Sequence, residues 1–262
     1  FVYRFYNASL INFDDLVGFP LPAKDGRLEY VKTPAAVWGA GAVIFDEISR
    51  CRPDIQNKLF PIVHERKVQG LALDDLKYRW AAMNPPSTDD NENGYSGSEP
   101  LDAALADRFA FVVEMPAWDQ LTEHEQLAII GATDIVIDPA AALALANTLA
   151  HIRAALPSVR LSLAERVAGY VRTVLALLVQ AGIPLSPRRG GMILRSILAV
   201  HAAAAIVDPG LTPSDSTLLA LRCGLPQRAQ GIAVSETKLL AAHREAWRLA
   251  DIQPGDPLRA IL

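Results

Sequence analysis

The stretch that most constrains the fold is a short apolar run that ends in two adjacent carboxylates. Four apolar residues, 42–45, follow one another without a break, and Asp46 and Glu47 come next. Such a run suits a strand buried on both faces, as in a parallel sheet covered by helices. Parallel sheets bind ligands beyond the carboxyl ends of their strands, where these two acids would lie. The alternative is an ordinary exit from a strand into a loop.

Composition narrows the class of protein. With 262 residues, the chain is long enough for a sizeable core and two subdomains. The net charge of -4 gives no broad basic field, so we do not expect nucleic acid as a partner. Cys51 and Cys223 have neither a disulfide framework nor metal-ligand spacing, which favours a reducing cytoplasm. We find no apolar run that we would expect to cross a membrane, and we interpret the alanine-rich stretch 199–207 as part of a packed helix.

The pattern of hydrophobic residues changes near residue 116. Before it, strands, hairpins and short helices alternate; after it, the period is helical throughout. Ser162 and Glu165 match a capping box at the start of one of these helices. We therefore expect an α/β domain over 1–116, an all-helical subdomain over 117–207 and a helical extension over 208–262. The predicted strands are 1–8, 42–46, 79–84 and 110–115, the hairpins 19–35 and 66–79, and the later helices 119–132, 138–155, 161–181, 188–206 and 235–250.

Three further polar residues are candidates for a site with Asp46 and Glu47. Asn84 ends the next core strand, Arg108 ends a short helix, and Arg188 begins a helix of the all-helical part. Each has a simpler explanation when taken alone. Asn84 precedes a proline and could make a turn, Arg108 could pair with its neighbour at the surface, and Arg188 could cap its helix. The adjacent Arg189 leaves the last assignment open by one position.

Taken together, these features resemble the AAA+ ATPases, in the branch that includes the MoxR, CbbQ/NorQ and dynein-related proteins. The resemblance covers roughly residues 1–200 and implies a parallel-sheet core of the P-loop NTPase type, followed by an all-helical lid. The motifs are specific only in combination. They are Asp14-Leu16-Val17-Gly18, Val43-Ile44-Phe45-Asp46-Glu47-Ile48, Ala82-Met83-Asn84-Pro85, Asp107-Arg108-Phe109 and Ser186-Pro187-Arg188.

The resemblance implies a role for each candidate residue. Asp46 ends a Walker B strand and would coordinate Mg²⁺ on ATP, while Glu47 would orient or deprotonate the attacking water. Asn84 would be sensor 1 and align that water. Arg108 would be an arginine finger that reaches the nucleotide of a neighbouring subunit. Arg188 would be sensor 2 on the lid, acting in its own site or in a neighbour's.

The resemblance also implies partners. ATP and Mg²⁺ would be the cofactors of a homo-oligomeric ring, expected to be a hexamer, that remodels or activates a client protein, with a von Willebrand A domain protein as a possible partner. The hairpins at 19–35 and 66–79 would contact substrate or partner, unless they are ordinary surface hairpins. Two alternatives stay open: an interaction subunit that does not hydrolyse ATP, and a nucleic-acid motor, against which the charge counts.

One motif that such a site needs does not occur in these 262 residues. A phosphate-binding loop has the form G-x-x-x-x-G-K-[ST] and holds phosphates with backbone N–H groups. The nearest string, 18–25, has alanine in place of the second glycine and includes two prolines, which lack an N–H. Since the chain begins where the second strand of the family would begin, we expect that the first strand and its Walker A loop precede Phe1.

Overall fold

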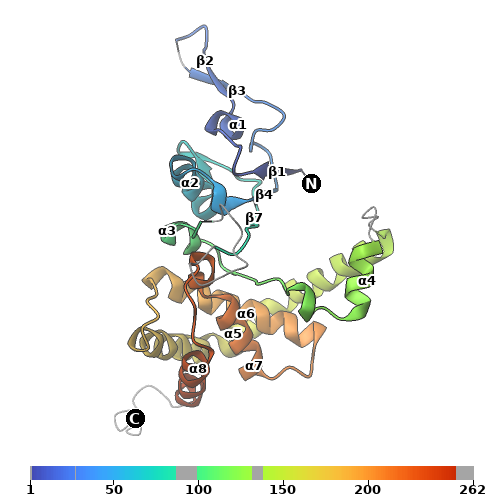
Figure 1. Ribbon diagram of the computed structural model, residues 1–262, viewed down its shortest axis with the longest axis vertical. Coiled ribbons are helices and arrows are strands. Elements are labelled where there is room, and N and C mark those ends of the chain that lie inside the picture. The colour runs from blue at the N-terminus through green and yellow to red at the C-terminus, as the bar shows by residue number, and fades with distance from the viewer. Residues whose placement is uncertain (1, 27, 87–98, 132–137, 252–262) are drawn as a thin grey trace. The chain divides into compact units, whose positions relative to one another are not determined.

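The computed structural model describes residues 2–26, 28–86, 99–131 and 138–251 (Figure 1). It forms two compact units. The core unit comprises Phe1–Phe109 and Pro226–Ala233, and the helical unit comprises Ala110–Leu225 and Val234–Leu262. The units divide after Phe109, Leu225 and Ala233, whereas the sequence predicts domain boundaries after 116 and 207. The assignment of 117–207 as a lid and 208–262 as an extension therefore stays a prediction.

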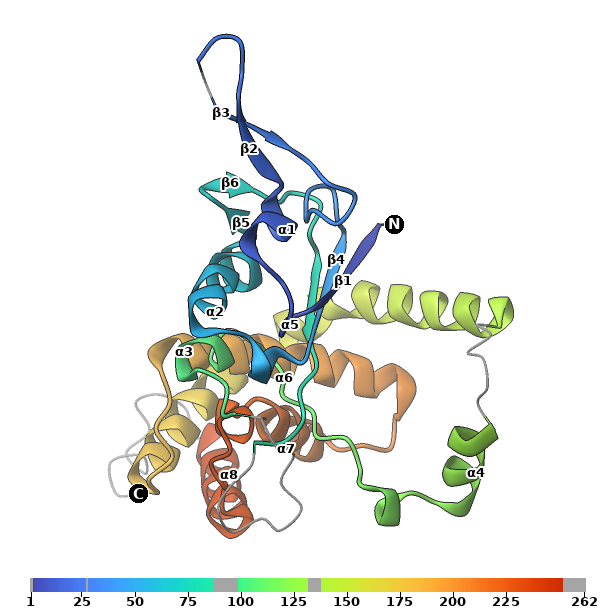
Figure 2. The same cartoon turned by 45° about the horizontal axis from the view of Figure 1, so that its top comes forward.

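A parallel sheet organises the core unit (Figure 2). Its strands are β1 (Tyr3–Asn7), β4 (Ala42–Asp46) and β7 (Tyr78–Ala81), in the order β1-β4-β7. Both pairings are parallel, so the three carboxyl ends lie at one edge of the sheet. Val43 and Phe45 in the central strand are fully buried. The predicted buried strand that ends in two acids is confirmed.

Short helices flank this sheet. They are α1 (Phe13–Val17), η1 (Ile48–Arg50), α2 (Pro53–Phe60), η2 (Pro61–Glu65), α3 (Ala103–Ala106) and η4 (Pro226–Gln230). Pro53 occupies the first turn of α2, where its missing N–H costs nothing. Pro61 marks the change from the α-helix to the wider turn of η2.

Both predicted hairpins are present. β2 (Phe19–Pro22) pairs with β3 (Leu28–Val31), and β5 (Lys67–Val68) pairs with β6 (Leu71–Ala72), each antiparallel. Gln69 and Gly70 form the two-residue turn of the second hairpin, with φ of 50° and 80°. Positive φ at both positions is typical of a type I′ turn, whose twist matches that of the paired strands.

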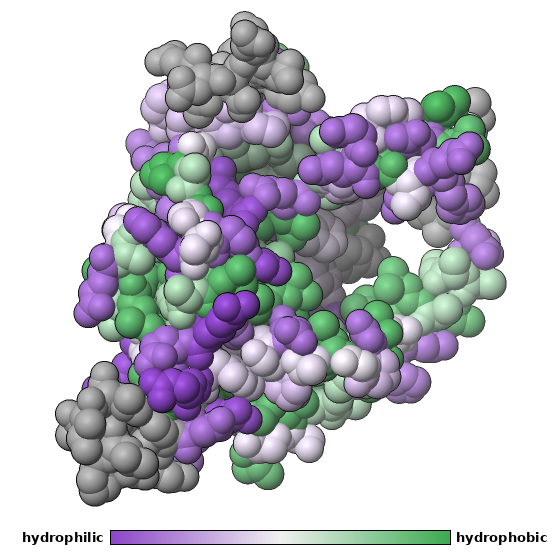
Figure 3. Space-filling view, turned by 60° about the horizontal axis from the view of Figure 1, so that its bottom comes forward, coloured by the Kyte–Doolittle hydropathy of each residue, from purple (hydrophilic) through white to green (hydrophobic). Residues whose placement is uncertain are grey.

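The helical unit consists of η3 (Trp118–Gln120), α4 (Glu123–Gly131), α5 (Pro139–Gln180), α6 (Pro187–Val207), α7 (Pro213–Cys223) and α8 (Glu236–Ala250). Its core is built mainly from the second half of α5 together with α6 and α8, and fully buried side chains include Tyr170, Val174 and Leu239. Several large apolar residues of α4 and of the first half of α5 are exposed, among them Ile130 and Leu143. Figure 3 shows apolar residues interspersed among hydrophilic ones on one face of the molecule.

Two predictions about regular structure are wrong. The predicted strand 110–115 has no regular structure, because no described strand pairs with it; instead the Val112 N–H donates to the Cys223 carbonyl at 2.7 Å. The predicted helices 138–155 and 161–181 are one continuous helix, α5, with Pro157 inside it. Ser162 is therefore not a cap: its hydroxyl donates to the Ser158 carbonyl within the helix.

Helix α7 is absent from the sequence predictions, although its start carries clear signals. Thr212 caps it and accepts a hydrogen bond from the Asp215 N–H, and Pro213 occupies the first helical position. The predicted helices 188–206 and 235–250 are confirmed as α6 and α8. A capping residue followed by proline and an early acid could have identified α7 as well.

Among the described helices, α6 alone is long and apolar enough to cross a bilayer, judged by length and composition. This is weak evidence, because the core helix of a folded domain passes the same test. Ile193, Ile197 and Leu198 belong to the core of the helical unit, so α6 packs against protein, as the interpretation of 199–207 as part of a packed helix expects.

Candidate functional site

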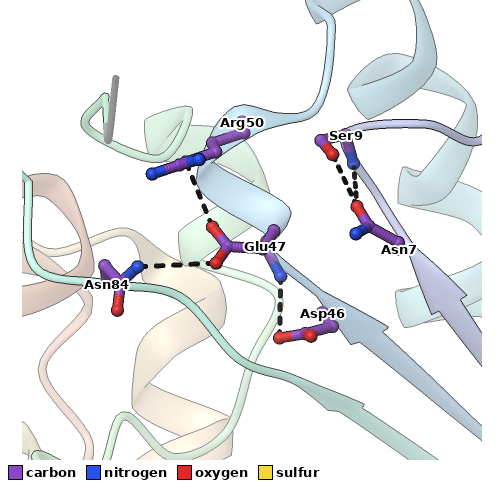
Figure 4. A network of polar contacts seen from close by, with 6 residues as sticks. All are labelled: Asn7, Ser9, Asp46, Glu47, Arg50 and Asn84. Carbon is purple, nitrogen blue, oxygen red and sulfur yellow. Dashed lines mark hydrogen bonds and ion pairs between the residues drawn. The ribbon is translucent and has the colours of Figure 1, made fainter. Parts of the chain in front are cut away.

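The carboxyl edge of the sheet brings together residues that are far apart in the sequence (Figure 4). Asn7 and Asp46 are direct partners in the β1–β4 register. Beyond the end of β7, the Ala82 N–H donates to Phe45 at 2.9 Å and the Ile48 N–H donates to Ala82 at 3.1 Å. These backbone hydrogen bonds extend the pairing and carry the chain toward Asn84 on the same side as Glu47.

Glu47 adopts an unusual backbone conformation. It is left-handed, with φ 53° and ψ 39°, and it begins the 3₁₀ turn η1. Its N–H donates to Asp46 Oδ1 at 3.0 Å. A residue with a side chain pays on the order of 1–2 kcal/mol for this conformation, and such strain is concentrated at functional sites. The strained turn directs the Glu47 carboxylate away from Asp46 and toward Asn84 (Figure 4).

The Glu47 carboxylate is held from two sides. Asn84 Nδ2 donates to Glu47 Oε1 at 3.4 Å, and Arg50 Nε lies 3.2 Å from Oε2 in an ion pair. Oε2 is buried and accepts no hydrogen bond from the described residues, because the Arg50 contact lacks hydrogen-bond geometry. The side chain keeps 28% of its surface exposed. The carboxylate is therefore oriented by both neighbours while part of the side chain stays exposed.

The carboxylates at this edge of the sheet suit a magnesium ion that is also coordinated by phosphate oxygens. No group of three His, Cys, Asp or Glu side chains in the described part of the chain could hold a metal ion by itself. Mg²⁺ at nucleotide sites is bound by one or two carboxylates, with water and phosphate oxygens completing the octahedron. Asp46, half-buried at the end of β4, fits that pattern.

Arg108 lies outside the network of Figure 4. It follows α3, its Nη1 donates to the Ala104 carbonyl, and its guanidinium lies 4.4 Å from the centre of the Phe60 ring in α2. Asp102 caps α3 by accepting from the Ala104 and Leu105 N–H groups. Arg108 is thus supported by two helices of the core unit while part of its surface stays exposed.

Arg188 and Arg189 differ sharply in burial. Ser186 caps α6 and accepts from the Arg189 N–H, so both arginines lie in the first turn. The Arg188 side chain is exposed, whereas Arg189 is fully buried. Both arginines belong to the helical unit, whereas Asp46 belongs to the core unit. The structure distinguishes the solvent-facing arginine from the buried one, which the sequence could not do.

Sequence reasoning missed Arg50 as part of the site. It pairs with Glu47 three residues earlier, at the two ends of the η1 turn. Oppositely charged residues at this spacing face each other across one helical turn, so the pattern Glu-x-x-Arg was an available signal. Asp46, Glu47 and Asn84 do converge in the structure, as the carboxyl-edge argument predicts.

Known proteins resemble this chain in structure but not in sequence. The sequence matches no family model and no curated protein. The structure is similar to that of a protein from Cytophaga hutchinsonii provisionally assigned as an ATPase, at 16% identity and a TM-score of 0.56, covering 97% of this chain and 78% of that one. The chain has an AAA+ ATPase-like fold. This confirms the predicted fold class, a parallel sheet with flanking helices and a helical region after it.

A second similar structure is a full-length MCM homologue from Methanopyrus kandleri. It is 15% identical to this chain, with a TM-score of 0.36; the match covers 95% of this chain but only 46% of the homologue. At that score the likeness carries no argument. The AAA+-like assignment of the fold rests on the first comparison and on the order of the strands.

Proposed function

We propose that this chain forms the hydrolytic part of an AAA+ ATPase of the MoxR and CbbQ/NorQ type. The observation that carries the proposal is the convergence of Asp46, Glu47 and Asn84 at one edge of the parallel sheet, with Asn84 Nδ2 3.4 Å from Glu47 Oε1. Parallel sheets bind ligands at this edge, and a carboxylate pair beside an amide is the chemistry that ATP hydrolysis uses.

Each residue has a separate task in this proposal. Asp46 would hold a magnesium ion, which supplies positive charge to the nucleotide phosphates when bound. Glu47 accepts a proton from the attacking water through the carboxylate that Asn84 and Arg50 orient. Asn84 donates a hydrogen bond to the same carboxylate. It would keep the water in line with the γ-phosphorus.

The proposal requires a phosphate-binding loop from the rest of the full-length protein. The 262 residues contain no G-x-x-x-x-G-K-[ST] string, so the groups at the Asp46 edge supply metal binding and water activation only. By resemblance to the AAA+ family, that loop would follow a strand that precedes the one corresponding to β1.

Assembly and partners are inferred from the family resemblance, and the partly exposed Arg108 and the exposed Arg188 support them. Arg108, held at the surface of α2 and α3, would act on the nucleotide of a neighbouring subunit in a ring, which we expect to be a hexamer. Arg188 would serve as sensor 2. The hairpin β2–β3 exposes Phe19 and Leu21 and would contact a client protein, with a von Willebrand A domain protein as a candidate partner. Cys51 and Cys223 are not joined in a disulfide, and this cysteine usage favours a cytoplasmic location.

The test is magnesium-dependent ATP hydrolysis by the full-length protein and its Asp46→Asn variant. Loss of the metal-binding carboxylate should lower turnover by about tenfold or more at any given magnesium concentration. Asp54→Asn is the matched control, because Asp54 is an exposed acid of α2 outside the network. Equal turnover by both variants and the wild type would remove Asp46 from the site.

A second function is supported by one observation, the absence of a G-x-x-x-x-G-K-[ST] string from these 262 residues. If the full-length protein lacks a phosphate loop, the AAA+-like fold would serve as an interaction subunit that binds partners without hydrolysis. Two measurements separate these functions: binding of ATP, and assembly with partners in the presence and absence of nucleotide. An interaction subunit of this kind would assemble equally well in both conditions.

A further inference from the structure

The segment Pro226–Ala233 belongs to the core unit, although the residues before and after it belong to the helical unit. Two residues separate it from the end of α7, and it ends shortly before α8. Pro226, Gln227 and Ala229 are buried, and the Ile232 N–H donates back to the Gln227 carbonyl at 3.0 Å. One compact turn, η4, thus belongs to the core unit, although the helices before and after it in the chain belong to the helical unit.

That turn packs against α3, the short helix that precedes Arg108. The Leu101 N–H, just before α3, donates to the Ala229 carbonyl at 3.1 Å, and η4 is in contact with α3. Leu101 and Leu105 on either side of the Asp102 cap are buried. A helix of four residues cannot hold itself in place, so its position depends on what packs around it.

Arg108 is therefore placed by neighbours on two sides of α3. Phe60 supports the guanidinium through a ring contact at 4.4 Å, and the Ala104 carbonyl accepts from Nη1. A shift of α3 moves the Ala104 carbonyl and with it the guanidinium. Displacements of about 1 Å are enough to cost a large part of the rate in a charge-stabilising contact.

We propose that Pro226–Ala233 is a positioning element for Arg108, which fixes α3 against the core and ties the placement of the guanidinium to the helical unit through its covalent links to α7 and α8. This inference rests on the proposed function. Ala229 is its key residue, because its carbonyl accepts from the Leu101 N–H just before α3 and its side chain is buried, so that a larger side chain has to displace its neighbours.

The test is a double-mutant cycle in the full-length ATPase with Ala229→Leu and Arg108→Ala. We expect Ala229→Leu to lower kcat about tenfold with KM for ATP unchanged, because α3 is displaced while the Asp46 edge is not. In the Arg108→Ala background the same substitution should lower kcat by less than about twofold, since the group it displaces is gone. Ile232→Ala is the matched control, as Ile232 is an exposed residue of the same segment.

The outcomes separate this inference from the proposed function. Equal losses from Ala229→Leu in both backgrounds, or no loss in either, would overturn the positioning role. An Arg108→Ala protein as active as the wild type would instead contradict the role of Arg108 itself. Circular dichroism checks folding; if Ala229→Leu does not fold, the smaller Ala229→Val replaces it in the cycle, and a failure of that variant to fold would show that the segment serves stability and overturn the inference.

Discussion

Asn84 Nδ2 donates to Glu47 Oε1 over 3.4 Å, although 37 residues separate the two in the chain. The contact exists because β4 and β7 are neighbouring parallel strands and both side chains follow their carboxyl ends. It fixes one oxygen of a carboxylate whose other oxygen faces Arg50. Two neighbours therefore orient the Glu47 carboxylate in the folded chain, which is what its proposed role in activating water requires.

Replacing Asn84 with alanine should lower ATP turnover by about tenfold or more while leaving nucleotide binding intact. The amide that orients Glu47 would be lost, whereas Asp46 and the phosphate contacts would remain. Steady-state hydrolysis and equilibrium binding of a fluorescent ATP analogue measure the two effects. Asn57→Ala, on the exposed side of α2, is the control. Loss of binding together with turnover would show that Asn84 contacts the nucleotide in another way.

Replacing Arg108 with alanine should lower turnover by more than about tenfold, as loss of an arginine finger does elsewhere. If the finger acts across a subunit interface, Arg108→Ala subunits mixed with Glu47→Gln subunits should recover part of the activity, because some interfaces then combine an intact Glu47 with an intact Arg108. Turnover is measured over a series of mixing ratios. No recovery at any ratio would contradict the sharing of the site.

Tyr170→Phe should destabilise the protein by about 1–3 kcal/mol, because it leaves a buried ring nitrogen without its partner. Tyr170 and His243 share a hydrogen bond of 2.9 Å between the hydroxyl and Nδ1, and both side chains are buried. Burial raises the pKa of the Tyr170 hydroxyl, so this group stays protonated. Urea denaturation gives the free energy of unfolding, with Tyr3→Phe as an exposed control. Equal stability of the two variants would contradict the prediction.

The helical unit should lose stability in mild acid. Burial lowers the pKa of His243, opposed by the charge of Asp215 and reinforced by Arg222 and Arg244; burial also lowers the pKa of His201. Both rings hydrogen-bond serines of α7: His243 Nε2 contacts the Ser214 hydroxyl at 3.1 Å, and His201 Nδ1 contacts the Ser216 hydroxyl at 3.0 Å. Protonation of the two histidines would therefore affect both of these contacts with α7.

The sign follows from proton uptake. Below the ordinary histidine pKa of 6.5, the unfolded chain binds protons that the folded protein does not, so the free energy of unfolding falls as the pH drops from that value toward the lowered folded pKa. Denaturation curves between about pH 7.5 and 5.5 measure this slope. The slope should be shallower in His243→Gln than in His151→Gln, which replaces an exposed histidine. Identical slopes would contradict the account.

The sequence predicted those parts of the molecule that local pattern controls. The run 42–45 and the acids after it define β4 and its carboxyl edge, and Ser186 with Pro187 defines the start of α6. The pattern failed where a neighbour decides the outcome. Residues 110–115 alternate like a strand but pair with no described strand, and Pro157 lies within a helix because packing of the second half of α5 outweighs one lost hydrogen bond.

The sequence also predicted only some of the side-chain contacts at the site. The spacing of Asp46-Glu47 and Asn84 predicted their convergence because parallel strands end at one edge. The ion pair of Arg50 with Glu47 and the burial of Arg189 depend on turns whose geometry is settled only in the folded chain. Likewise, nothing in the sequence around Ala229 indicates that a segment from among the late helices returns to α3.

The most direct test of the central claim is ATP hydrolysis by the full-length Glu47→Gln protein, measured beside binding of magnesium–ATP. The amide keeps the size of the side chain but cannot take a proton, so turnover should fall by about a hundredfold or more while binding is retained. Glu65→Gln, an exposed glutamate at the end of η2, should leave both unchanged. Turnover by Glu47→Gln equal to that of Glu65→Gln would contradict the assignment of the sheet edge as the hydrolytic site.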